Sequence, residues 1–321
     1  MRDASILTPE AIRRAHAAIP PVFRDTPQYV HEGLSARVGE PVVAKVETVN
    51  PIGSFKGRGT WVALQELVRR GEIGRDRAVV VASTGNFGQG IAYAARALGV
   101  PAVVYADAHA NPSKLERIRS FGATVVQEGR DFDAARAASA AKAAGEGSTL
   151  LVDGDEPAIA TGAGSIGLEL TAAADRGDLP PLANAYIPVG NGSLIIGIGS
   201  WLRAVSPGCR VVGVQSDAAP SMTLSWRAHR PIETETAATA AEGIATRVPV
   251  PRALELMDGR VDDMLLIPER DLEGARRELQ GALGVLVEHS AAVSWLGLRA
   301  DAARVPGASL LLITGGNAAP A

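Results

Sequence analysis

Short apolar runs alternate with longer amphipathic stretches along most of the chain, and glycine separates many of them. The runs that predict strands are 42–47, 78–82, 102–105, 124–127, 185–189, 210–215, 264–267 and 309–313. The stretches that predict helices are 8–19, 61–70, 88–98, 112–121, 131–144, 155–177, 193–205, 271–281 and 291–303. Residues 216–263, rich in Thr, Ala and Pro, interrupt this order and are expected to be an irregular insertion. Strands that alternate with helices predict parallel βαβ units.

This order predicts an α/β fold with two open, mostly parallel, three-layer lobes. We expect residues 1–75 and 150–321 to form the larger lobe and residues 76–149 the smaller one. Ligand loops in such folds lie at the carboxyl ends of parallel strands. The sequence therefore predicts a ligand site in a cleft between the two lobes.

Composition and charge are those of an ordinary globular protein. The chain has 321 residues, 46% hydrophobic and 21% charged, with a net charge of −3. Acidic and basic residues are mixed, so we expect no binding to nucleic acid or to a membrane. The N-terminal residues lack the apolar core of a secretory signal, and the sole cysteine, Cys209, excludes an internal disulfide. These features predict a soluble, cytoplasmic protein.

The stretch 50–60, NPIGSFKGRGT, holds one lysine in a glycine-rich segment that reads as a turn before a helix. Lys56 follows Phe55, and apolar residues resume at Trp61. A lysine beside an aromatic ring in a tight turn is placed to form a Schiff base with an aldehyde cofactor. Alone, this pattern is weak evidence, because most lysines near glycines are solvated.

Three further motifs accompany it: STGNFGQG at 83–90, PVGNGSL at 188–194 and TGGN at 314–317. Together with the lysine stretch they resemble the landmarks of the pyridoxal-phosphate enzymes of fold type II, which include threonine and serine dehydratases, serine racemases, threonine synthases and cysteine synthases. The resemblance runs from about Thr26 to the end of the chain. It implies that pyridoxal 5'-phosphate lies between the lobes, with Lys56 as its covalent anchor and as the catalytic base, and with Phe55 beside it.

The resemblance also implies roles for the first strand-to-helix loop. Ser83, Thr84, Gly85 and Asn86 fall where relatives bind the substrate carboxylate, and such a turn offers free N–H donors to an anion. Asn86 is expected to contact the phenolic oxygen of the cofactor. A polar N-cap would also explain Ser83 and Thr84 without any ligand. A hydroxyl at the position of Thr84 serves racemase relatives as a second acid or base, which keeps racemisation open.

The second loop resembles the phosphate-binding cup of the family. Its cofactor-binding residues would be Gly190, Asn191, Gly192, Ser193 and Leu194. The Gly-Asn-Gly version is similar to that of threonine synthases, whereas dehydratases and racemases usually carry a run of glycines.

Two more positions match family sites that contact the cofactor. Thr314 falls where the family places a hydroxyl against the pyridine nitrogen, which favours loss of a β leaving group over transamination. Glu288 falls where relatives carry a glutamate near the cofactor; a buried carboxylate is costly unless it is paired. At Gln215, relatives often carry an acidic metal ligand. Since hard cations prefer carboxylates, no required metal is expected.

The predicted function is that of an ammonia-lyase (EC 4.3.1 type) acting on a small β-hydroxy amino acid such as L-threonine or L-serine. A threonine synthase-like replacement enzyme is the nearest alternative, although those enzymes usually carry an aspartate at the position of Gly57. A racemase comes third, and a catalytically silent binding protein is the alternative from a different class. Relatives are commonly dimers, so we expect a homodimer.

Overall fold

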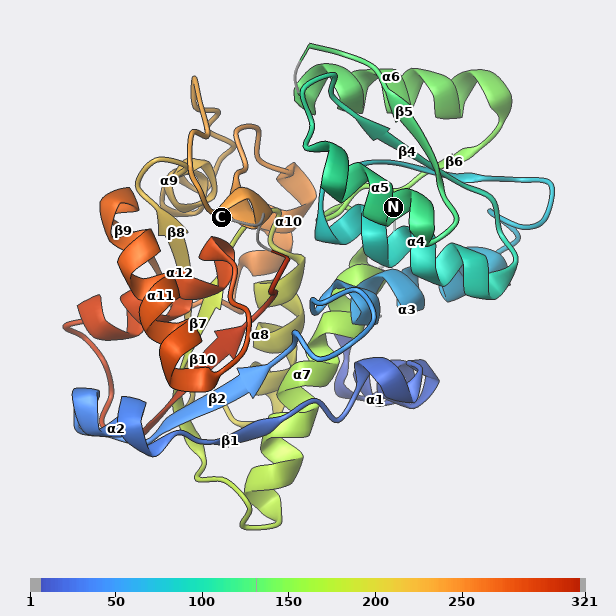
Figure 1. Ribbon diagram of the computed structural model, residues 1–321. Helices are drawn as coiled ribbons and strands as arrows, with labels where there is room; N and C mark the ends of the chain where they lie inside the picture. Colours follow the sequence, from blue (N-terminus) through green and yellow to red (C-terminus); the bar gives the residue numbers. More distant parts are fainter. Residues whose placement is uncertain (1–6, 131, 318–321) are drawn as a thin grey trace.

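The chain forms two separate β-sheets, each flanked by helices (Figure 1). The computed structural model describes residues 7–130 and 132–317. The larger sheet has the strand order β1-β2-β10-β7-β8-β9 and the smaller one β5-β4-β3-β6. The strands are β1 (Gln28–Val30), β2 (Val42–Val46), β3 (Val79–Ala82), β4 (Ala102–Ala106), β5 (Thr124–Gln127), β6 (Thr149–Leu150), β7 (Leu182–Pro188), β8 (Arg210–Ser216), β9 (Asp263–Ile267) and β10 (Ala308–Ile313). Only β1 pairs antiparallel among these strands; every other pairing is parallel.

Helices cover both faces of each sheet. They are α1 (Pro9–Ala18), α2 (Glu32–Val38), α3 (Lys56–Arg69), α4 (Asn86–Leu98), α5 (Pro112–Ser120), α6 (Phe132–Glu146), α7 (Pro157–Asp175), α8 (Ser193–Val205), α9 (Ser221–Ala228), α10 (Pro251–Met257), α11 (Leu272–Leu283) and α12 (His289–Ala300), with short 3-10 helices at η2 (Pro21–Phe23), η3 (Glu242–Ile244) and η4 (Glu269–Asp271). In the larger sheet, α12 packs on one face and α8 on the other, with α7 against α8. In the smaller sheet, α6 and α4 take the opposite faces. The predicted fold class, two mostly parallel three-layer α/β lobes, is confirmed.

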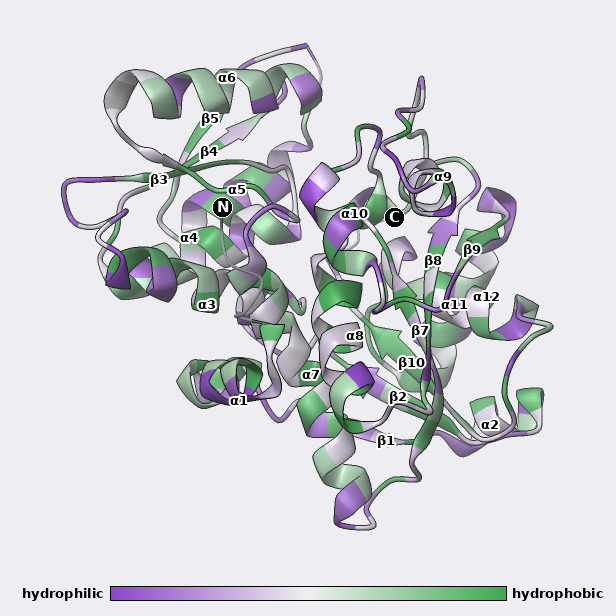
Figure 2. Cartoon of the chain, turned by 180° about the vertical axis from the view of Figure 1, so that it is seen from behind, coloured by the Kyte–Doolittle hydropathy of each residue, from purple (hydrophilic) through white to green (hydrophobic). Residues whose placement is uncertain are grey.

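The central strands are buried on both faces, as parallel sheets require. Every residue of β2 and of β10 is buried. Figure 2 shows the hydrophobic strands β7 and β10 among the surrounding helices. None of the helices within 7–130 and 132–317 has the length and hydropathy of a membrane span.

The prediction of an irregular insertion at 216–263 was wrong in two places, where α9 and α10 form. Helix α10 begins with Pro251 at its first position and buries Ala253, Leu256 and Met257 on one face. Both helices are short, so their apolar periodicity does not extend over enough residues to be recognised. For the same reason β1 and α2 lay within a stretch that had no predicted element.

The glycine-rich segment predicted as a turn is helical from Lys56 onward, because α3 begins at that residue. A Cβ at Gly57 would lie 2.4 Å from the ring of Phe23, and one at Gly59 would lie 2.6 Å from the carbonyl oxygen of Ile159. These glycines therefore allow α3 to pack closely against its neighbours. They are not there to turn the chain.

Helix α3 also bears on the predicted lobe boundaries. Its residues Ala63, Leu64 and Leu67 share a hydrophobic core with Val79 of the smaller sheet and Ile91 of α4. The boundaries near residues 75 and 150 stay a prediction. The predicted chain ends of the larger lobe, 1 and 321, and the predicted start of the helix at residue 131 lie outside the described residues.

Candidate active site

The predicted site residues lie around one cleft between the two sheets. Its volume is about 1790 Å³. The residues predicted from sequence that line it are Phe55, Lys56, Ser83, Thr84, Gly85, Asn86, Gly190, Asn191, Gly192, Ser193, Leu194, Glu288 and Thr314. The structure thus brings four distant sequence motifs together, at the carboxyl ends of parallel strands. Their individual roles stay predictions.

Lys56 stands at the first position of α3, and its amine has both ionic and aromatic partners. Its Nζ lies 2.6 Å from Oδ2 of Asp153. The same nitrogen lies 4.8 Å from the ring centroid of Phe55 and 5.8 Å from that of Phe87. Only 14% of the Lys56 side chain is exposed. Two rings and one carboxylate therefore surround a cation that the cleft shields from solvent.

The loop Gly190–Leu194 has the features of an anion cradle. It follows β7, and Gly192 at φ 93° precedes α8, whose first residue is Ser193. The first N–H groups of a helix have no partner within the helix, and they attract an anion such as phosphate. A Cβ at Gly190 would lie 3.1 Å from the carbonyl oxygen of Gly243, so a larger residue would crowd the loop.

Asn86 connects the first loop to the other side of the cleft. Its Nδ2 donates to both carboxylate oxygens of Glu288, at 3.0 and 3.1 Å. Its Oδ1 accepts from Nδ2 of Asn317 at 2.8 Å. Burial raises the pKa of the Glu288 carboxyl, and the bonds from Asn86 and the charge of Lys114 oppose that rise. The contact with Asn86 gives this half-buried glutamate a hydrogen-bonding partner.

Ser83 acts locally as a helix cap. Its Oγ accepts from the N–H groups of Gly85 at 3.3 Å and of Gly88 at 2.9 Å. Gly85 occupies the N-cap position of α4, so Ser83 caps the helix from two residues before that position. Thr84, the next residue, lines the cleft. Contact of this loop with a substrate carboxylate stays a prediction.

Thr314 is buried, and its hydroxyl Oγ1 has no hydrogen-bond partner among the residues that the structure describes. Its carbonyl accepts from the N–H of Phe55 at 3.0 Å, which places it directly beside the lysine segment. A buried, unpaired hydroxyl is unfavourable unless a ligand completes it. Together with the lysine and the anion cradle, this orphaned hydroxyl fits a ligand that carries an aldehyde, a phosphate and a ring acceptor. Pyridoxal 5'-phosphate has these three groups.

Gln215 occupies the position where a metal-binding carboxylate was considered. It is buried, and its Oε1 accepts from the backbone N–H of Thr223 at 2.7 Å and from its hydroxyl at 2.9 Å. The amide is neutral and its oxygen is already in use. The absence of a required metal stays a prediction.

Sequence reasoning missed Asp153 and Asn317 as members of the site. Asp153 follows β6 after Leu151 and Val152, and its Oδ1 accepts from Oγ of Ser193 at 2.6 Å. The sequence predicts no strand at residues 149–150, because β6 has only two residues, and no local signal therefore marks Asp153. Asn317 closes a motif that was recognised, yet no contact was assigned to it.

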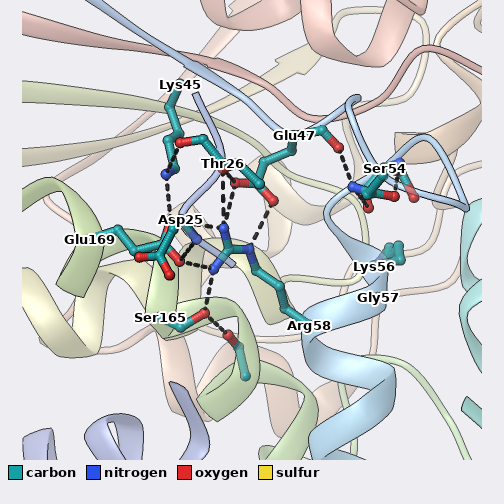
Figure 3. A network of polar contacts seen from close by, with 12 residues as sticks. Asp25, Thr26, Lys45, Glu47, Ser54, Lys56, Gly57, Arg58, Ser165 and Glu169 are labelled. Carbon is teal, nitrogen blue, oxygen red and sulfur yellow. Dashed lines mark hydrogen bonds and ion pairs between the residues drawn. The ribbon is translucent and has the colours of Figure 1, made fainter. Parts of the chain in front are cut away.

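Helix α3 is anchored behind the lysine by a buried ionic network (Figure 3). Arg58, fully buried, donates to Glu47 at 2.8 and 2.9 Å and to Glu169 at 2.5 and 2.9 Å. Lys45 also pairs with Glu169, and the hydroxyl of Thr26 donates to Glu47 at 2.6 Å. The two cations and two anions balance, so the network can persist without solvent.

Comparison with known proteins identifies relatives over nearly the whole chain. The family model described as "Pyridoxal-phosphate dependent enzyme" matches residues 19–315. The L-threonine ammonia-lyase of Geobacter sulfurreducens is 32% identical over 285 residues, covering 88% of this chain and 69% of that protein. The enzyme of the same name from Thermotoga maritima is 33% identical over 288 residues, covering 90% and 70%. The solved structure of a threonine deaminase from T.th. superposes with a TM-score of 0.89 at 30% identity, covering 98% of this chain and 99% of the other.

Proposed function

The chain belongs to the family of pyridoxal-phosphate-dependent enzymes, and on that premise we propose that it is an ammonia-lyase of small β-hydroxy amino acids. The substrate would be L-threonine or L-serine, and the products a 2-oxo acid and ammonia. Relatives named L-threonine ammonia-lyase at 32% and 33% identity support this choice of substrate class.

The observation that carries the proposal is the orphaned hydroxyl of Thr314. We assign it to the ring nitrogen of the cofactor. Unlike a carboxylate, a hydroxyl does not hold a proton on that nitrogen, so the ring draws electrons less strongly. Prompt loss of a β substituent is then favoured over slower reactions such as transamination.

When bound, pyridoxal phosphate supplies an aldehyde that joins amines and a ring that takes up the electron pair left on the α carbon. Lys56 would anchor it and, with its amine free, would remove the substrate α-proton with its Nζ. Across the whole reaction the Cα–H and Cβ–O bonds break, and the proton and the hydroxide leave together as one molecule of water. The enamine that departs hydrolyses to the 2-oxo acid and ammonia.

The loop at the start of α4 orients the substrate. The N-terminus of this helix offers backbone N–H donors to the substrate carboxylate, and Ser83 stabilises the loop through its capping bonds. Asn86 holds its place through Glu288 and Asn317. The loop Gly190–Leu194 would hold the phosphate group from the opposite side of the cleft.

The test is to add L-threonine, L-serine and O-phospho-L-homoserine to the purified protein while recording its absorbance. Ammonia and oxo acid are assayed in parallel. We expect a cofactor band that shifts with threonine or serine and both products in equal amounts. In Lys56→Ala the band and all turnover should be lost; a variant that keeps activity would refute the assignment. A protein with no cofactor band would point to a binding protein.

A threonine synthase-like reaction would appear as release of phosphate from O-phospho-L-homoserine alone. The lack of space beside Phe23 argues against a threonine synthase-like reaction, because a Cβ at Gly57 would lie 2.4 Å from that ring. An aspartate there, as in threonine synthases, would not fit. Racemisation is the second candidate, since Thr84 lines the same cleft as Lys56. Chiral chromatography after incubation with L-serine would reveal D-serine.

We propose further that the enzyme works as a cytoplasmic homodimer. Its sole cysteine, Cys209, is buried and free, which is compatible with a reducing compartment. Light scattering of the purified protein at several concentrations tests the dimer, and fractionation of the source cells tests the location.

A further inference from the structure

The Lys56 amine has a carboxylate partner that no predicted role explains. Oδ2 of Asp153 lies 2.6 Å from Nζ of Lys56, and 9% of the aspartate side chain is exposed. Charge-assisted bonds of this length are among the strongest polar contacts in proteins. An anion so close to the reacting lysine influences where that amine can go.

Asp153 is itself rigidly placed. Its second oxygen, Oδ1, accepts from the hydroxyl of Ser193 at 2.6 Å. The next residue, Gly154, has a φ of 92°, and a Cβ there would lie 2.5 Å from the carbonyl oxygen of Asn191. The segment that carries Asp153 is therefore pressed against the loop Gly190–Leu194. Its carboxylate is fixed on one side and offers its other oxygen to the lysine.

A free lysine side chain is flexible, whereas proton removal needs a defined position. The ε-amine sits on a four-carbon stem with several rotatable bonds. A misplacement of about 1 Å can cost about 100-fold in rate. When Lys56 is released from covalent attachment, it needs a fixed partner to stay near the α carbon.

We propose that Asp153 is a positioning residue for Lys56, holding the released amine against the substrate α carbon. The inference rests on the proposed function. In the step that it assists, the α C–H bond breaks and the proton passes to Nζ of Lys56. The resulting ammonium remains paired with the Asp153 carboxylate, which keeps its own charge throughout and neither gains nor loses a proton.

The first experiment uses the cofactor-free protein and needs no activity. Formaldehyde and cyanoborohydride methylate accessible amines, and peptide mass spectrometry reports each lysine separately. In Asp153→Asn we expect methylation of Lys56 to be faster by about threefold or more, because its charge-assisted bond is lost. Lys114, whose side chain is 16% exposed and paired with Glu242, serves as an internal reference that should not change. Equal labelling of Lys56 in both proteins would overturn the proposal.

The second experiment uses the loaded enzyme in D₂O with L-alanine, which has no β leaving group. Exchange of the α-proton, followed by NMR, then reports the action of Lys56 alone. Asp153→Asn should slow exchange by about tenfold or more, while the concentration of half-saturation changes little. Asp155→Asn is the control, because it removes the same charge two residues away. Asp155 is not among the described residues that line the cleft, so this variant should exchange the α-proton at the wild-type rate.

Chemical rescue separates positioning from a structural role. Asp153→Ala leaves room for a small carboxylate, and added formate should restore exchange saturably. A folded Asp153→Ala protein that formate does not rescue would refute the proposal, as would an Asp153→Asn variant that exchanges at the wild-type rate. If wild type itself shows no cofactor band and no exchange, the proposed function is refuted. The methylation experiment still tests, independently, whether Asp153 holds the Lys56 amine.

Discussion

Replacing Arg58 with methionine should destabilise the protein strongly, although Arg58 does not line the cleft among the described residues. Methionine has a similar length and no charge. The change leaves Glu169 with Lys45 and the His16 ring as partners, whereas Glu47 loses the guanidinium that pairs with it, so one buried negative charge becomes uncompensated. Removing one partner of a buried ion pair costs about 3–5 kcal/mol.

The expected shift in melting temperature follows from the chain length. An unfolding entropy of about 2.1 cal/mol/K per residue, applied to 321 residues, corresponds to about 0.7 kcal/mol/K. A loss of 3–5 kcal/mol therefore lowers the Tm of Arg58→Met by about 4–7 °C. Differential scanning calorimetry of the cofactor-free protein measures this shift without any contribution from ligand binding.

Two companion variants make the reasoning refutable. Adding Glu47→Gln to Arg58→Met removes the uncompensated charge and keeps an acceptor for the Thr26 hydroxyl, so about 1–2 kcal/mol should return. Arg69→Met, on the exposed side of the same helix, should leave the Tm where it is, because surface ion pairs contribute little. An Arg58→Met protein that melts like wild type, or a double variant no more stable than the single one, would show that charge balance does not govern this network.

Three further outcomes are expected. Thr314→Val removes a hydroxyl that has no partner among the described residues, so urea unfolding of the cofactor-free protein should show unchanged stability or a gain of up to about 1 kcal/mol. The rate of ammonia release from threonine should nevertheless fall about tenfold. Turnover equal to that of wild type would contradict the role assigned to the Thr314 hydroxyl. Burial raises the pKa of Glu288 in the folded state. The Glu288 carboxyl therefore contributes its full stabilisation below its unfolded-state pKa of about 4.3, and this stabilisation is lost as the pH rises through its folded-state pKa. Glu288→Gln cannot ionise and should lose less stability than wild type as the pH is raised from 4 toward neutrality in urea titrations, whereas parallel curves would refute this. Because a neutral amide stands at Gln215, dialysis against EDTA should leave turnover unchanged, and a loss restored by a divalent cation would overturn that expectation.

The parts of the site that sequence could predict are those whose signal is local. Lys56 and the loop Gly190–Leu194 stand in short motifs, and the alternation of strands and helices places these motifs at one edge of the sheets. Asp153 could not be assigned in this way, because its partners Lys56 and Ser193 lie 97 and 40 residues away along the chain. Only folding shows which side chain completes its contacts.

The buried network and the short elements were hidden for related reasons. Arg58 reads as a polar residue in a glycine-rich segment, and its contact with Glu169 spans 111 residues. Gly57 and Gly59 suggested a turn. Their packing role could not be recognised, because the ring and the carbonyl group that require their small size belong to distant segments. Short helices such as α10 lack the length over which periodicity can be read.

Helix α7 has a mechanical consequence, because it runs without interruption through the cores of both sheets. Its residues Ala158 and Ile159 pack in the core of the smaller sheet, whereas those from Ala160 onward pack in the core of the larger one. The change of core falls within the first turn of α7, so a rotation of one sheet against the other would strain that turn and the packing around it.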